Sequence, residues 1–249
     1  MIIGIEVYDR DVIRKICEHP QIDGVVIGDL YCQKRMFENG IYDMFAYIDI
    51  LKSCGEKVIF QTPRYITDRN MEEEIEKVRF LVENKQIDAV IVQDIGVAAE
   101  IAEILPDLEL IWGKMGYNRN PVANRSFFEF LKQYRVYSVE TADPKRKQVF
   151  QAMGLNVYTM VGDLKYQSVN RECYYLYQND IFDKKCDRGC LKRKQELVQV
   201  NGRIQMTVDG YMLGRRYDYS RMPESEDEWK NSILYGRDYK EILQYIKIS

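Results

Sequence analysis

The chain has 249 residues, of which 46% are hydrophobic and 30% are charged, a composition typical of globular proteins. Its 36 basic and 39 acidic residues leave a net charge of −3, so charge alone gives no reason to expect unassisted nucleic-acid binding or a polybasic membrane anchor. The single histidine, His19, excludes chemistry that needs two histidines in one chain. No apolar run approaches the roughly 18 residues of a transmembrane helix, and the early Glu6 argues against a signal peptide. We therefore expect a cytoplasmic protein without a membrane span.

Short apolar runs alternate with amphipathic stretches over the first two thirds of the chain. The apolar runs predict seven strands, at residues 2–7, 24–28, 57–61, 88–93, 108–112, 136–139 and 156–161. The stretches between them predict helices at 10–18, 37–53, 70–84 with Asn70 as its cap, 97–105, 126–134 and 144–153. Regular βα units of this kind favour an α/β fold, a (β/α)8 TIM-barrel-like domain. An open doubly wound sheet is the alternative, although no glycine-rich phosphate motif follows the first strand.

The pattern changes after Gly162. Residues 163–195 lack a clear period and form a cysteine-bearing loop after the seventh strand, and a loop of this length inside a compact domain is usually functional. Residues 196–208 predict a hairpin around Asn201-Gly202, and the acidic tail becomes weakly helical from 238 to 246. We expect one domain over 1–249, with regular units to 162, the loop to 195, and a hairpin and irregular tail over 196–249.

Four cysteines form the most informative pattern. Cys173, Cys186 and Cys190 are spaced C-x12-C-x3-C, and Cys32 follows the second predicted strand. Four thiolates can hold an iron–sulfur cluster or a closed zinc site. Zinc usually prefers paired C-x2-C knuckles, which favours iron–sulfur and leaves zinc as the alternative. The nearby cations that would favour thiolates and offset cluster charge are Lys184, Lys185, Arg188 and Lys192.

The other two cysteines have a simpler interpretation. We expect Cys17 and Cys54 to be small buried hydrophobic residues near helix ends. A disulfide framework is not expected, because the predicted compartment is reducing.

Several polar residues follow predicted strands, and such residues point at the active face of a parallel barrel. The candidate acids or bases are Asp94 and Glu140, since burial can raise the pKa of a carboxyl group. Arg35 could hold an anionic substrate by bidentate contacts. The alternative is that these side chains cap helices, form ion pairs or are solvated. Further polar residues expected at the barrel mouth are Asp29, Gln61 and Lys114. Further arginines that could bind an anionic substrate are Arg64 and Arg171.

The chain resembles the collagenase-like "unassigned peptidase" family, and most closely the smaller iron–sulfur subunit of oxygen-independent ubiquinone hydroxylation. The lone cysteine after the second strand and the C-x12-C-x3-C spacing carry this resemblance over roughly residues 1–215. Other matching stretches are Gly28-Asp29, residues 90–96, Glu140 and residues 201–205. The loop at 113–126 and the acidic tail depart from the family pattern.

The resemblance implies a barrel fold and a 4Fe–4S cluster held by Cys32, Cys173, Cys186 and Cys190. It implies oxygen-independent hydroxylation or related redox chemistry, with a paralogous protein subunit, an electron donor or acceptor and an unknown small-molecule substrate. RNA is a further partner class in the family, but the charge of this chain does not indicate it. The alternatives are a non-catalytic iron–sulfur or electron-transfer subunit and, ranked lower because no nucleophile–base pair is visible, a peptidase.

Overall fold

The structure is a computed structural model of the 249-residue chain. It describes residues 1–28, 36, 39–63, 66, 68–114, 121–165, 168–169, 195–198, 205–209, 212–213 and 216–246. Of these, the side chains of 68–69, 121–124, 163–165, 168–169, 195–198, 205–209, 212–213 and 216 are not described.

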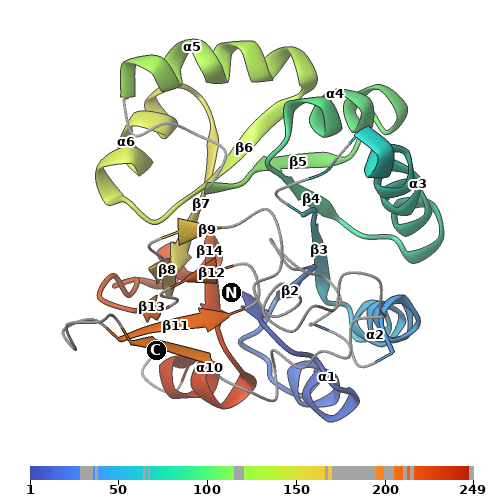
Figure 1. Ribbon diagram of the computed structural model, residues 1–249, viewed down its shortest axis with the longest axis vertical. Helices are drawn as coiled ribbons and strands as arrows, with labels where there is room; N and C mark the ends of the chain where they lie inside the picture. Colours follow the sequence, from blue (N-terminus) through green and yellow to red (C-terminus); the bar gives the residue numbers. More distant parts are fainter. Residues whose placement is uncertain are drawn as a thin grey trace.

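Eight parallel strands close into a barrel in the order β1-β14-β7-β6-β5-β4-β3-β2 (Figure 1). The barrel closes at β1, because Ile2 of β1 pairs with Ile233 of β14 on one side and with Gly24 of β2 on the other. The strands are β1 (Ile2–Ile5), β2 (Gly24–Ile27), β3 (Lys57–Gln61), β4 (Ala89–Val92), β5 (Glu109–Trp112), β6 (Val136–Thr141), β7 (Asn156–Val161) and β14 (Ser232–Gly236). The predicted (β/α)8 class is therefore confirmed.

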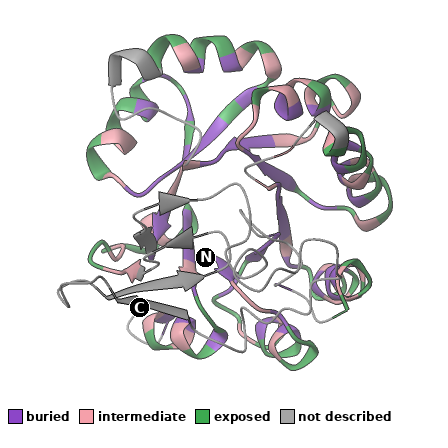
Figure 2. Cartoon of the chain, in the orientation of Figure 1, coloured by how far each residue is buried: buried purple, intermediate pink, exposed green. Residues whose placement is uncertain are grey.

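Helices surround the barrel, with their buried faces toward the strands and their exposed faces outward (Figure 2). They are α1 (Arg10–Cys17), α2 (Ile41–Ser53), α3 (Asp68–Lys85), α4 (Ile95–Ile104), α5 (Pro121–Leu131), the 3-10 turn η3 (Lys132–Tyr134), α6 (Pro144–Ala152), α9 (Glu226–Lys230) and α10 (Tyr239–Ile246). Asn70 lies inside α3, so the predicted cap at that residue is wrong: the helix begins earlier, at Asp68.

Two small antiparallel sheets interrupt the barrel between β7 and β14. In one sheet β8 (Asp163–Lys165) pairs with β13 (Arg216–Asp218), and the other has the order β10-β11-β12-β9. Its strands are β9 (Ser168–Val169), β10 (Gln195–Val198), β11 (Gln205–Asp209) and β12 (Met212–Leu213). Val198 lies opposite Gln205, so the predicted hairpin is present. The eighth barrel strand comes only after this insertion, within the segment for which the sequence predicted an irregular tail.

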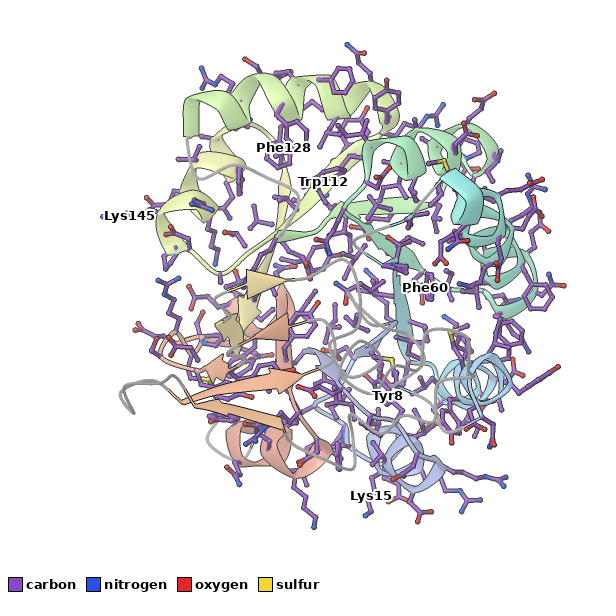
Figure 3. All side chains as sticks on the ribbon, viewed as in Figure 1. Tyr8, Lys15, Phe60, Trp112, Phe128 and Lys145 are labelled. Carbon is purple, nitrogen blue, oxygen red and sulfur yellow. A yellow bond between two sulfur atoms is a disulfide. The ribbon has the colours of Figure 1, made fainter. Side chains whose placement is uncertain are left out.

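The core has two layers, separated by the barrel wall. Inside the barrel lie small and branched residues, Ile2, Val26, Ile59, Ala89, Ile91, Ile111 and Ile233. Outside it, between strands and helices, lies a larger cluster that includes Phe60, Trp112 and Phe128 (Figure 3). Aromatic edges meet in this outer layer, with Phe128 and Phe150 5.0 Å apart between ring centroids. The alternation along each strand follows from the pleat, which points successive side chains to opposite faces.

The surroundings of Cys17 and Cys54 differ from the prediction that both are buried hydrophobic residues. Cys17 ends α1 and is half-buried, Cys54 follows α2 and is exposed, and the two are joined in a disulfide with 5.7 Å between their Cα atoms. The prediction that both are buried hydrophobic residues is therefore wrong. The physical reason is that consecutive barrel helices run parallel, so the carboxyl ends of α1 and α2 lie at the same end of the barrel.

Candidate active site at the carboxyl end of the barrel

Glu140 lies near the carboxyl end of β6 and points into the barrel. Its side chain is 1% exposed, its Oε1 accepts a 2.6 Å hydrogen bond from the Tyr235 hydroxyl of β14, and its Oε2 accepts a 3.4 Å bond from the Lys114 backbone N–H. Burial raises the pKa of Glu140, and the Tyr235 and Lys114 contacts offset part of that rise. A carboxyl group of this kind holds its proton at higher pH than an exposed glutamate and can exchange it with a bound molecule.

Lys114 follows β5 beside Glu140. Its Nζ atom is shielded from solvent, and burial lowers the pKa of this amine to about 8, with the Arg221 charge acting in the same direction and Glu140 opposing it. Arg221 reaches the same end of the barrel, where its Nη1 donates to the backbone oxygen of Ala142, just after β6. The mouth therefore brings together one buried acid and two cations.

A tyrosine pair extends this network across the mouth. Tyr217 of β13 donates a 2.8 Å hydrogen bond to Glu6, which follows β1, and lies near enough to Tyr235 to contribute to the rise in the pKa of Tyr235. Burial and the neighbouring Glu140 raise the pKa of Tyr235 well above its usual value, so it stays a hydrogen-bond donor at any physiological pH. The insertion that carries β13 is thus attached to the barrel mouth by the Tyr217–Glu6 hydrogen bond.

Two amides complete the described part of the mouth. Gln61 ends β3 and is buried, and Gln93 follows β4. The Oε1 of Gln93 is buried and has no hydrogen-bond partner within the described ranges. Gly113 makes room for this side chain, because a Cβ at that position would lie 2.6 Å from the Gln93 Cγ. An unpaired buried acceptor costs about 1–3 kcal/mol, so Gln93 is available to accept a hydrogen bond from a ligand or a bridging water.

Asp94 lies at the amino end of α4 and serves as its N-cap. Its Oδ1 accepts a 3.1 Å hydrogen bond from the Val97 N–H, which is the geometry of a capping residue. The helix-capping alternative predicted for this residue is therefore present, whereas for Glu140 the partners are other mouth residues.

The remaining predicted site residues lie outside the described residues. They are Cys32, Cys173, Cys186, Cys190 and Arg35, together with Asp29, Arg64 and Arg171. Among the residues that the structure describes, no group of three or more His, Cys, Asp or Glu residues is placed to hold a metal ion.

Gly28 and Met36 flank residues 29–35, the segment that carries Cys32, and both are held by hydrogen bonds at the barrel mouth. Gly28 follows β2 with a positive φ of 112°, and its N–H donates to the Met36 Sδ at 3.2 Å. The Met36 carbonyl in turn accepts a 3.0 Å bond from the Tyr8 N–H after β1. The chain thus leaves and rejoins the barrel at the carboxyl ends of β1 and β2, with Cys32 in between.

Sequence reasoning missed Glu6, Gln93, Tyr217, Arg221 and Tyr235. Glu6 and Gln93 lie at the carboxyl ends of the predicted strands 2–7 and 88–93, and applying to them the rule used for Gln61 would have found them. Tyr217, Arg221 and Tyr235 required knowledge of the eighth strand and of the insertion before it. His19 lies in the turn before β2, at the amino end of the barrel, as the sequence indicated.

Comparisons with known proteins agree with this architecture. The family model described as peptidase family U32 matches residues 14–139. Among solved structures, the chain is similar to one described as the U32 peptidase Mk0906, at 11% identity and a TM-score of 0.56, covering 94% of this chain and 91% of that one. A glycerophosphodiester phosphodiesterase from Parabacteroides distasonis is similar at 12% identity and a TM-score of 0.47, covering 65% and 84% of the two chains. No curated protein matches the chain. At 11% identity, the similarity to the U32 peptidase structure supports the barrel fold and does not extend to activity or ligands.

Within the described residues, no helix is both long and apolar enough to cross a membrane.

Proposed function

Because this chain belongs to peptidase family U32, whose model covers residues 14–139, we propose that it is an iron–sulfur member of that family. In this proposal Cys32, Cys173, Cys186 and Cys190 hold a 4Fe–4S cluster above the barrel mouth. The protein acts in oxygen-independent hydroxylation or related redox chemistry, together with a paralogous subunit and an electron donor or acceptor.

The observation that carries the proposal is where the two cysteine-bearing segments join the barrel. The Cys32 segment departs at Gly28 and returns at Met36, both beside the carboxyl ends of β1 and β2. The other three cysteines lie in residues 170–194, inside the insertion that follows β7 and that Tyr217 attaches to Glu6 at the same end. Cys32 and the three later cysteines, although far apart in sequence, therefore belong to two segments that both join the barrel at its carboxyl end.

The cluster, when bound, supplies one-electron transfer. The described residues supply proton handling beside it. Burial raises the pKa of Glu140, so this group can take up or release a proton in the buried mouth, and Tyr235 donates a hydrogen bond to its carboxylate form. Burial lowers the pKa of Lys114 to about 8, so this amine can also exchange a proton. Positioned acids and bases of this kind accelerate reaction steps that move a proton to or from the substrate.

Substrate handling is assigned to three residues in this proposal. Glu140 is the acid or base, and Arg35 binds an anionic group of the substrate. Asp94 places a carboxylate at the same end of the barrel, where its Oδ1 already accepts the hydrogen bond that caps α4. A non-catalytic electron-transfer subunit would differ from this catalyst, because it would need the cluster but would not need the Glu140 side chain.

Peptidase activity is the second candidate, because the family bears that name. His19 lies at the amino end of the barrel, opposite Glu140. A histidine-assisted nucleophile at the mouth is therefore not available from this chain, and a hydrolase would have to use another base, such as Glu140.

The test is anaerobic purification followed by iron and sulfide analysis and a visible absorption spectrum. We expect about four irons and four sulfides per chain, lost in Cys186→Ala and retained in the control Cys54→Ser. Zinc in their place, or no metal in protein purified and handled without oxygen, contradicts the redox proposal. Glu140→Gln then separates the roles: a catalyst keeps its iron and loses turnover, whereas an electron-transfer subunit keeps both. Hydrolysis that persists after the cluster is removed would favour the peptidase.

A further inference from the structure

Cys17 and Cys54 form a pair at the amino end of the barrel, on a different face from the proposed cluster. Cys17 ends α1 and Cys54 follows α2, and the 5.7 Å between their Cα atoms lies within the range of unstrained disulfide backbones. The bond links the ends of two consecutive helices through cysteines that are 37 residues apart in sequence. It therefore closes a loop that includes β2 and the whole Cys32 segment.

The two sulfur atoms differ in accessibility. Cys54 is exposed, in a turn that ends at Gly55, whereas Cys17 is half-buried and its Sγ lies 4.0 Å from the Ile50 carbonyl oxygen of α2. A small disulfide molecule in solution can therefore reach Cys54 first, and Cys17 is placed to attack the product.

From this arrangement we propose that Cys54 is a thiol-modification site for low-molecular-weight disulfides such as oxidised glutathione, with Cys17 as its resolving partner. The Cys54 thiolate attacks the small disulfide, forms a mixed disulfide and releases one small thiol. The Cys17 thiolate then attacks the Cys54 sulfur, forms the Cys17–Cys54 bond and releases the second small thiol. Two protein thiols are oxidised and one small disulfide is reduced to two thiols, so the exchange balances without another oxidant.

The position of the pair favours a slow, structural switch rather than a catalytic one. Both cysteines lie at helix carboxyl ends, where the helix dipole disfavours a thiolate, and reactive cysteines are found instead at helix amino ends. The consequence of oxidation is a covalent link between α1 and α2 that restricts the unfolded chain. Oxidising conditions therefore stabilise the α1–α2 part of the barrel, at the end opposite the segment that carries Cys32.

The test begins with protein purified anaerobically in reductant, with its metal content intact, and then treated with oxidised glutathione without oxygen. Alkylation and peptide mass analysis should show Cys17 and Cys54 converting from free thiols to one disulfide. Cys17→Ser should instead accumulate glutathione on Cys54. The midpoint of thermal unfolding should rise by about 5 °C or more on oxidation. The Cys17→Ser/Cys54→Ser double variant should show no such rise.

Two results overturn the proposal. The first is that Cys17 and Cys54 stay alkylatable in the folded protein after prolonged excess glutathione disulfide, which would mean that the site does not take small disulfides. The second is that the bond resists dithiothreitol until the protein is unfolded, which would make it a permanent crosslink and no switch. Iron content measured on the same samples keeps this outcome separate from that of the proposed cluster, because neither cysteine is among its four ligands.

Discussion

At the scale of single residues, the buried polar groups differ in what surrounds them. Glu140 and Lys114 lie together at the mouth, with Tyr235 donating to the acid. Glu56 is buried at the opposite end, near Asp23 and the amino terminus, and its Oε2 has no hydrogen-bond partner in the described part of the chain. A buried carboxyl group with hydrogen-bond donors beside it, such as Glu140, can take part in chemistry. A buried carboxyl group that lacks such a donor on one oxygen, such as Glu56, mainly lowers the stability of the protein.

Tyr235→Phe should destabilise the protein by about 1–3 kcal/mol, because it leaves the buried Glu140 carboxylate without its hydroxyl donor. Removing that donor should also raise the pKa of Glu140 further, since the hydrogen bond favours the charged form. Urea unfolding measures the first effect. The control is Tyr239→Phe, which removes a hydrogen bond to the neutral Lys15 carbonyl and should cost less. Equal losses in the two variants would contradict a charged partner at the mouth.

Glu56 should make stability depend on pH. Burial, with repulsion from Asp23, raises the pKa of Glu56 to about 7, above its value in the unfolded chain. A raised folded-state pKa contributes stability that is present below about pH 4.5 and is lost as pH rises through about 7. In Glu56→Gln this loss should be smaller by about 1–2 kcal/mol, measured by urea unfolding across that range. Parallel pH profiles for the two proteins would show that Glu56 titrates normally.

At the scale of elements, the ends of strands and helices position the mouth residues. Asp94 both follows β4 and caps α4, so one side chain completes a helix and borders the mouth. Gly28 allows the chain to turn away from β2 toward Met36. Both features are local, and each can be tested with a substitution that leaves the rest of the barrel in place.

Asp94→Ala should cost about 1 kcal/mol of stability, because the Val97 N–H loses its acceptor. Asp94→Asn should cost only a few tenths, since asparagine caps helices about as well. Chemical unfolding of both variants measures this difference. Activity then shows whether the carboxylate has a second use: an asparagine variant that is stable but inactive places Asp94 in the reaction, and full activity limits it to capping.

Gly28→Ala should destabilise the protein by about 2 kcal/mol or more, since Gly28 has a φ of 112° and an added Cβ would lie closer than 3.0 Å to the Gln61 backbone. The matched control is Gly55→Ala, which has a φ of 84° but open space around the added atom, so only the backbone cost of about 1 kcal/mol remains. Thermal unfolding compares the two. A Gly28→Ala variant no worse than its control would mean that the turn after β2 adjusts freely.

At the scale of the whole molecule, the barrel is completed by a strand that lies far along the chain from its neighbours. β14 pairs with β7 on one side and with β1 on the other, although the insertion separates it from β7. Long-range pairing of this kind makes the first and last parts of the chain depend on each other for stability.

Ile2→Ala and Ile233→Ala should test that dependence. The two side chains face each other inside the barrel across the β1–β14 pair, and each substitution should cost about 2–4 kcal/mol. The double variant should depart from additivity by about 1 kcal/mol, because the two residues share one packing site. Ile2→Ala combined with Ile101→Ala, on the outer side of the wall, should be additive. Additivity in both pairs would argue against barrel closure by β14.

The sequence by itself determined the repeating βα units, the carboxyl-end position of Gln61, Asp94, Lys114 and Glu140, and the hairpin near residue 200. These follow from local periodicity, because side-chain alternation and strand order are properties of short segments. It also supplied the four-cysteine hypothesis, which rests on spacing and remains a prediction.

Only the tertiary structure decided which strand closes the barrel, which partner Glu140 has, and that Cys17 meets Cys54. Each of these joins residues far apart in the chain: Tyr235 lies 95 positions from Glu140, and Cys54 lies 37 from Cys17. Such contacts are set by how closed strands and parallel helices bring distant segments to one end, which no local pattern encodes. For the same reason a five-residue strand after an irregular insertion could not be recognised until its two neighbours were in place.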